Sequence, residues 1–85
     1  MTENERKELN ELIEQKKAFC KAYCELINSH TRQHLESIDY KFDEETYEEW
    51  AVIRFNQYRT EKVNVSCDSR WGMMMDIMEE LEKHW

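Results

Sequence analysis

Two cysteines and two histidines are spaced as pairs that could hold a metal ion. Cys20 and Cys24 lie four residues apart, as do His30 and His34, and this spacing places both members of a pair on one face of a helix. A helix turns by about 600° between Cys24 and His30, so the two pairs point about 120° apart unless the helix breaks there. Zinc sites usually have a longer gap before the histidines. We therefore expect no metal and interpret the cysteines as small core residues, with a zinc site as the alternative.

Nucleophilic catalysis is the second chemistry that the residue types suggest. Cys67 precedes the last amphipathic segment, and a helix N-terminus can lower the pKa of a thiol. The base would have to be a histidine, and nothing in the sequence brings His30, His34 or His84 near it. The chain has no glycine-rich phosphate loop and no G-x-S-x-G or HExxH motif. We expect neither enzymatic activity nor a cofactor.

Acidic residues are concentrated in the middle of the chain. Residues 36–49 hold seven acidic residues against one base, Lys41, and so carry −6 of the total formal charge of −7. In an extended chain, alternate residues lie about 6.6 Å apart on one face, close to the spacing of phosphates along a nucleic-acid strand. A groove lined with lysine and arginine would fit such a surface. The alternative is a solvated edge whose charge prevents strand-to-strand aggregation.

Four aromatic residues, Tyr40, Phe42, Tyr47 and Trp50, lie among or directly after these acidic residues, and aromatic side chains anchor protein interfaces. We predict a partner-binding surface made of Glu36, Asp39, Asp43, Glu44, Glu45, Tyr47, Glu48, Glu49 and Trp50. The expected partner is a basic host protein that itself binds nucleic acid. Direct binding to nucleic acid or to an anionic membrane is not expected, because their phosphates require a basic face.

The composition indicates one folded domain over residues 1–85. With 40% hydrophobic residues the chain is too apolar for a disordered tail. No stretch approaches the ~20 apolar residues of a membrane span, and the first nineteen residues lack the apolar run of a signal peptide. Three cysteines are an odd number and suggest no disulfide framework. We expect free thiols and a cytoplasmic location.

Hydrophobic periodicity predicts the elements that position these residues. Thr2 and Glu5 form a capping-box pattern for a helix from about residue 3 to 29 or beyond, whose apolar stripe is interrupted at Lys16. Alternating patterns predict strands near 38–42, 50–55 and 63–65. Residues 47–58 also fit a helical stripe, so a helix is the alternative there.

A last helix, capped by Ser66 or Asp68, carries apolar residues on more than one face. The stripe expected to face the core is Trp71, Met74, Met75, Met78, Leu81 and Trp85. Met73 and Ile77 lie on another face and are the candidate interface of a homodimer. The whole chain is thus expected to be an α+β fold in the order α-β-β-β-α, with two helices packed on a three-stranded antiparallel sheet. A structural homo-oligomer or assembly component, joined through this last helix, is the alternative function.

The element order resembles that of double-stranded-RNA-binding domains. Those domains contact phosphates with lysines at the start of the last helix, where this chain reads Asp68-Ser69-Arg70-Trp71-Gly72-Met73, so the function does not carry over. The stretch Trp50–Leu81, with the strand WAVIRF, the segment KVNVSCDS and a methionine-rich helix, resembles small acidic proteins of bacteriophages and mobile elements, some of them anti-CRISPR proteins. This resemblance implies an inhibitor that occupies the basic groove of a nucleic-acid enzyme in the host cytoplasm. It assigns a function to no single residue.

Overall fold

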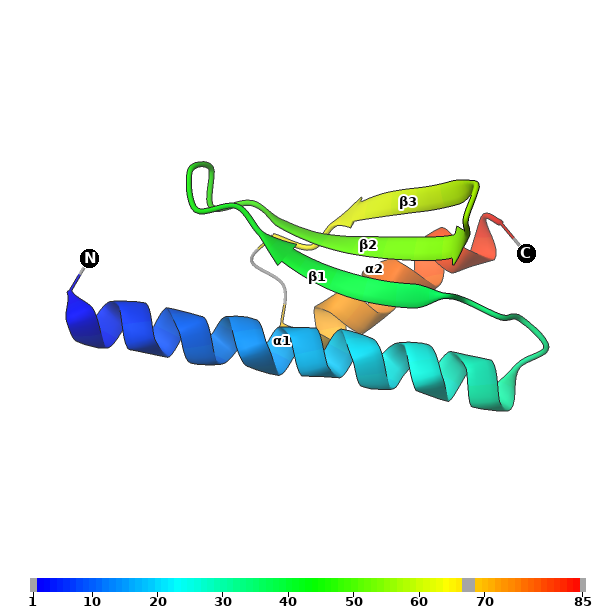
Figure 1. The fold of residues 1–85 in the computed structure, drawn as a ribbon, viewed down its shortest axis with the longest axis horizontal. Helices are drawn as coiled ribbons and strands as arrows, with labels where there is room; N and C mark the ends of the chain where they lie inside the picture. Colours follow the sequence, from blue (N-terminus) through cyan, green and yellow to red (C-terminus); the bar gives the residue numbers. More distant parts are fainter. Residues whose placement is uncertain (1, 67–68, 85) are drawn as a thin grey trace.

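The computed structural model describes residues 2–66 and 69–84. In chain order the elements are α1 (Glu3–His30), β1 (Ser37–Phe42), β2 (Glu49–Asn56), β3 (Arg59–Asn64) and α2 (Arg70–Glu82). The strands form an antiparallel sheet in the order β1-β2-β3, and both helices pack on one face of it (Figure 1). The expected α+β fold and its α-β-β-β-α order are confirmed. Residues 47–58, for which a helix was the alternative, contain β2.

Local side-chain hydrogen bonds fix both ends of α1. The Thr2 hydroxyl accepts the N–H of Glu5 at 3.2 Å, so the expected N-cap is present. After the helix ends, the amide of Asn28 donates to the C=O of Leu35 at 2.8 Å and accepts its N–H at 2.7 Å. This reversal lays β1 back along the helix in the opposite direction (Figure 1). The 28 residues of α1 span about 42 Å, close to the longest dimension of the molecule, 45 Å.

Alternation along each strand separates a core face from a solvent face. The inward side chains of β1 and β2 are buried, among them Ile38, Ala51 and Ile53. The outward residues of β1 include Asp39 and Lys41, which are exposed. The core therefore lies between one face of the sheet and the two helices.

The helix α2 begins one to three residues later than the expected caps would place it, and its core face differs in part from the expected one. Its cap is Ser69, whose hydroxyl accepts the N–H of Gly72 at 3.1 Å; Asp68, an expected cap, lies outside the described residues. Leu81 is buried as expected and Met74 packs against the core, but the rest of the expected stripe that the structure describes faces outward. The side chains that pack in the core are Met73, Ile77 and Leu81, each 0% exposed. The expectation that Met73 and Ile77 form an oligomer interface is therefore wrong.

The outward face of α2 carries Trp71 and Met75, which are 70% and 55% exposed, together with Met78. We call Trp71, Met75 and Met78 the apolar stripe. Periodicity could not separate the two faces, because both stripes have helical spacing. The last residue of each stripe distinguishes the two faces. The inward stripe of Met73 and Ile77 ends in the apolar Leu81, whereas the apolar stripe is followed one turn later by the charged Glu82. Trp85 lies outside the described residues.

Candidate functional site

The loop between β1 and β2 projects beyond the rest of the sheet (Figure 1). We call residues Asp43–Glu48 the acidic tip. Its shape depends on Asp43, whose carboxylate accepts the N–H of Glu45 at 2.9 Å and whose C=O accepts the N–H of Tyr47 at 2.8 Å. Tyr47 has a φ of 60°, in the left-handed region. The tip is thus a turn, and the expected extended spacing of its carboxylates is wrong.

The acidic tip offers charge and an aromatic ring to solvent. Its four carboxylates belong to Asp43, Glu44, Glu45 and Glu48, all exposed. Within the described residues none of the four has a lysine, arginine or histidine nitrogen within 4.0 Å. Tyr47 is 63% exposed and packs edge to face on Phe42 with ring centroids 6.2 Å apart. Unpaired carboxylates beside an anchored ring suit contact with a cationic surface.

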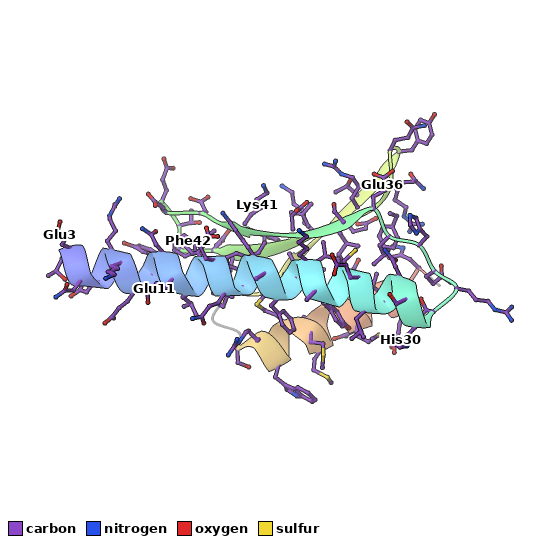
Figure 2. All side chains as sticks on the ribbon, turned by 60° about the horizontal axis from the view of Figure 1, so that its bottom comes forward. Glu3, Glu11, His30, Glu36, Lys41 and Phe42 are labelled. Atoms are coloured by element: carbon purple, nitrogen blue, oxygen red, sulfur yellow. The ribbon has the colours of Figure 1, made fainter. Side chains whose placement is uncertain are left out.

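The first turns of α1 lie beside the acidic tip and add to its charge. A small cavity of about 120 Å³ is lined by Arg6, Leu9 and Asn10 of α1 and by Phe42, Glu44 and Tyr47. Figure 2 shows Glu3 and Glu11 on the same end of the molecule as Phe42. Residues 3–14 hold five glutamates against two basic residues, and residues 43–48 hold four acidic residues and no base. We call these two segments the acidic pole. Its formal charge of −7 equals that of the whole chain, so the remaining residues are neutral in sum.

Four of the nine residues predicted for the partner surface lie outside this pole. Glu36 is exposed at the far end of β1, about 23 Å of extended chain from Asp43 (Figure 2). Asp39 and Trp50 lie on the open face of the sheet, where Asp39 accepts a hydrogen bond from Ser37 at 3.2 Å. The fourth, Glu49, is buried. A count of acidic residues along the sequence does not reveal this division, because neighbouring residues of a strand point to opposite faces of the sheet.

Glu49 is part of a buried polar cluster between α1 and the sheet. Lys16 Nζ and the Tyr40 hydroxyl both donate to Glu49 Oε1, and Lys16 lies 5.6 Å from the centroid of the Tyr40 ring. We call Lys16, Tyr40 and Glu49 the buried triad. Burial, and then the Glu49 carboxylate, raise the pKa of the Tyr40 hydroxyl. Lys16, the residue that interrupts the apolar stripe of α1, is thus explained by a partner 33 residues away.

The paired cysteines and histidines do not converge on a metal site. Cys20 and Cys24 are buried, and burial raises the pKa of Cys20 to about 11 and also raises the pKa of Cys24. Their thiols therefore stay protonated near neutral pH, the form that neither attacks nor ligates well. His30 and His34 are exposed, and among the described residues no group of three ligands includes any of these four. Cys67 lies outside the described residues.

Three other ligand-type side chains do meet, at Glu61, Glu80 and His84, with their polar atoms within 4.8 Å of one another. The Arg59 guanidinium contacts His84 Nδ1; a guanidinium only donates, so Nδ1 accepts and Nε2 carries the hydrogen. That hydrogen faces Glu80 Oε1 at 3.2 Å and Glu61 Oε1 at 3.9 Å. A metal on Nε2 would require the proton on Nδ1 instead. The cluster is therefore interpreted as a hydrogen-bonded polar network that joins β3 to the C-terminal end of α2.

The apolar stripe of α2 exposes three large hydrophobic side chains to solvent. It borders α1, because the Tyr23 hydroxyl reaches the C=O of Met74 at 3.5 Å, and Leu26, one turn beyond Tyr23, is 53% exposed. Exposed apolar patches of this kind mark interaction sites in folded proteins. The side chains of the stripe had been expected in the core, so that expectation is wrong.

Comparison with protein-family models, with curated proteins and with solved structures finds no match to this chain. Among the described residues, no helix combines the length and the apolar character that crossing a membrane demands.

Proposed function

We propose that this is a non-catalytic binding protein that docks its acidic pole on a basic surface of a partner protein. The observation that carries the proposal is the concentration of the entire net charge of −7 at one end of the molecule. Charge gathered at one pole steers association and favours a cationic partner over others. The surfaces with which proteins hold nucleic acid have this cationic character, so the docking would block such a surface.

The acidic tip also offers an aromatic side chain for close contact with a partner. Tyr47 is exposed but held against Phe42, so little side-chain freedom is lost when a partner covers it. Aromatic side chains that become fully desolvated are frequent hot spots of interfaces. The pole therefore combines long-range attraction with a site for close contact.

The test begins with affinity purification from the native lysate, followed by measurement of the affinity for the recovered partner over a salt series. The variant Glu44→Gln/Glu45→Gln/Glu48→Gln removes three charges of the tip. The matched control is Asp76→Asn/Glu79→Gln/Glu82→Gln, which removes three charges of α2, away from the pole.

We expect the tip variant to bind at least tenfold more weakly at low salt and to show a shallower salt dependence. The control should bind like the wild type. An oligonucleotide bound to the partner should be displaced by the wild type and not by the tip variant. Equal affinities of tip variant and wild type would refute docking through the acidic pole.

A second candidate function is assembly into a homodimer through the apolar stripe, favoured by the exposure of Trp71 and Met75. The stripe lies outside the acidic pole, but α2 itself holds four acidic residues and one base, so salt should favour the dimer by screening their repulsion. Sedimentation should then give a dimer mass that Met75→Glu converts to a monomer without unfolding. A monomer at high micromolar concentration contradicts this function. Met73→Glu or Ile77→Glu would test only the core.

A further inference from the structure

The free edge of β1 has backbone groups that face away from the sheet. The N–H of Asp43 bonds to the C=O of Glu48 at 2.9 Å, so by alternation the odd-numbered residues of β1 bond to β2. Even-numbered Tyr40 and Phe42 therefore direct their N–H and C=O groups to the edge. Among the described residues, the backbone of even-numbered Ile38 hydrogen-bonds the Cys24 thiol of α1, whereas no backbone hydrogen bond from another element takes up the groups of Tyr40 and Phe42. An edge of this kind is a template for another strand.

A groove runs along this edge, with α1 as its second wall. One cavity of about 500 Å³ is lined by Lys17, Lys21, Cys24, Glu25 and Asn28 of α1 and by Glu36–Lys41. A second, of about 320 Å³, is lined by residues from Asn10 to Lys17 and by residues from Tyr40 to Glu44. The two share Lys17, Tyr40 and Lys41, so they form one continuous groove beside β1. Figure 2 shows Glu36 and Phe42 toward its two ends. We call it the β1 groove.

The charges that line the β1 groove change sign along its length. Lys17, Lys21 and Lys41 lie at its middle with one acidic residue, Asp39, and glutamates lie toward both ends. Lys17 has an exposed partner, Glu14, at 3.6 Å. Lys21 and Lys41 have no carboxylate within 4.0 Å among the described residues. The middle of the groove is thus locally cationic in a protein of charge −7.

We propose that the β1 groove binds an extended segment of a partner protein with acidic side chains at its centre, which adds to the sheet beside β1 as a fourth strand. Strand addition takes affinity from backbone hydrogen bonds and specificity from the flanking side chains. A second copy of this chain does not fit. Pairing of two copies through β1 would place their β1 strands about 4.8 Å apart, but the α1 helices that lie beside these strands need 8–10 Å between their axes. This proposal does not depend on the acidic pole.

The probe is a capped seven-residue peptide of alternating threonine and valine in which glutamate replaces the two central threonines. At millimolar peptide, the amide signals of Tyr40 and Phe42 in the nuclear magnetic resonance spectrum should shift and become protected from hydrogen exchange. The opposite edge supplies the internal control: amides of Thr60 and Lys62 on β3 should not respond. The same peptide with lysine in place of glutamate should bind more weakly.

Two matched variants test the cationic middle of the groove. Lys21→Glu should weaken binding of the glutamate peptide by roughly three- to tenfold. Lys62→Glu, the same charge change on the open face of β3, should leave it unchanged. The variant Glu45→Gln/Glu48→Gln, which changes tip residues outside the lining of the groove, should also bind normally, which separates this result from that of the acidic pole.

Methylation of the peptide nitrogens that point toward β1 should abolish binding, and methylation of the alternate nitrogens should not. The proposal is overturned if the two peptides bind equally, if no shift occurs at Tyr40 and Phe42, or if shifts appear at the apolar stripe instead. It is also overturned if these amides shift with protein concentration alone, since the occupant would then be a second copy.

Discussion

Glu48 and Glu49 are neighbours in the sequence, yet their carboxylates lie in opposite environments. Glu48 belongs to the acidic tip and is exposed, whereas Glu49 accepts hydrogen bonds from Lys16 and Tyr40 in the core. An exposed carboxylate is stabilised by water and needs no partner, but a buried one must be paired. The acidic tip and the buried triad show that charges of one segment divide into those that remain available for binding and those that stabilise the fold.

The largest expected effect is on the buried triad. Glu49→Gln should lower the free energy of unfolding by about 3–5 kcal/mol, because it leaves Lys16 buried without its counter-charge. Glu48→Gln, the control one residue away, should change it by about 0.5 kcal/mol or less. Urea denaturation followed by circular dichroism measures both. The contrast between tip and triad disappears if the two variants are equally stable.

An apolar replacement of the pair sharpens this result. Lys16→Met combined with Glu49→Leu should recover much of the stability lost in Glu49→Gln, since no charge is then left buried without a partner. The same denaturation experiment applies. A double variant less stable than either single one would show that the ion pair itself, beyond mutual neutralisation, stabilises the fold.

A second test contrasts the two faces of α2. Ile77→Ala should cost about 2–5 kcal/mol, the range for removing a buried aliphatic group. Met75→Ala, on the apolar stripe, should cost about 0.5 kcal/mol or less in the monomer. Thermal and urea unfolding at low protein concentration compare them. A larger loss from Met75→Ala would mean that the stripe is covered.

A smaller effect is expected from removing charge at the acidic tip. Glu44→Gln/Glu45→Gln/Glu48→Gln should raise stability by a few tenths of a kcal/mol at low ionic strength, because the four like charges of the tip lie close together on one exposed turn. The gain should vanish in molar salt. A loss of stability at low salt would indicate that the tip carboxylates have structural partners.

The smallest effect concerns Glu80, whose pKa is lowered by its hydrogen bond with His84 and by Lys83. A lowered folded-state pKa means that the unfolded state binds the proton more tightly, so the contribution is present above the usual pKa of 4.5. It is lost as the pH falls through the lower folded-state value. Glu80→Gln should therefore flatten the decline of stability below pH 4.5, measured by urea titration. An identical decline in wild type and variant would contradict this role.

Hydrophobic periodicity predicted the type and order of the helices and strands. It did not predict which side chains would be buried and which exposed. Alternation at Ile38, Tyr40 and Phe42 and the Thr2 cap depend on neighbours in the sequence, so they could be predicted. The partner of Lys16 lies 33 residues away, and no local pattern encodes such a contact. The choice between Ile77 and Met75 as core residue also depends on how α2 sits on the sheet.

The candidate site was predicted in part for the same reason. Asp43, Glu44, Glu45, Tyr47 and Glu48 do lie together at the acidic tip. The glutamates of α1 could not be added to it from the sequence, because a whole helix and strand separate them from the tip. Their proximity arises from the antiparallel return of β1 along α1, a tertiary feature.

The sparse packing of the first turns of α1 has a consequence for motion. Leu9 and Ile13 are only half-buried and residues 2–8 are exposed, so the first turns open at a lower free energy than the turns around Cys20 and Ile27. Amide exchange should therefore quicken progressively toward Glu3. A partner bound at this end would slow amide hydrogen exchange in those turns first. The exchange rate there would therefore report whether a partner is bound.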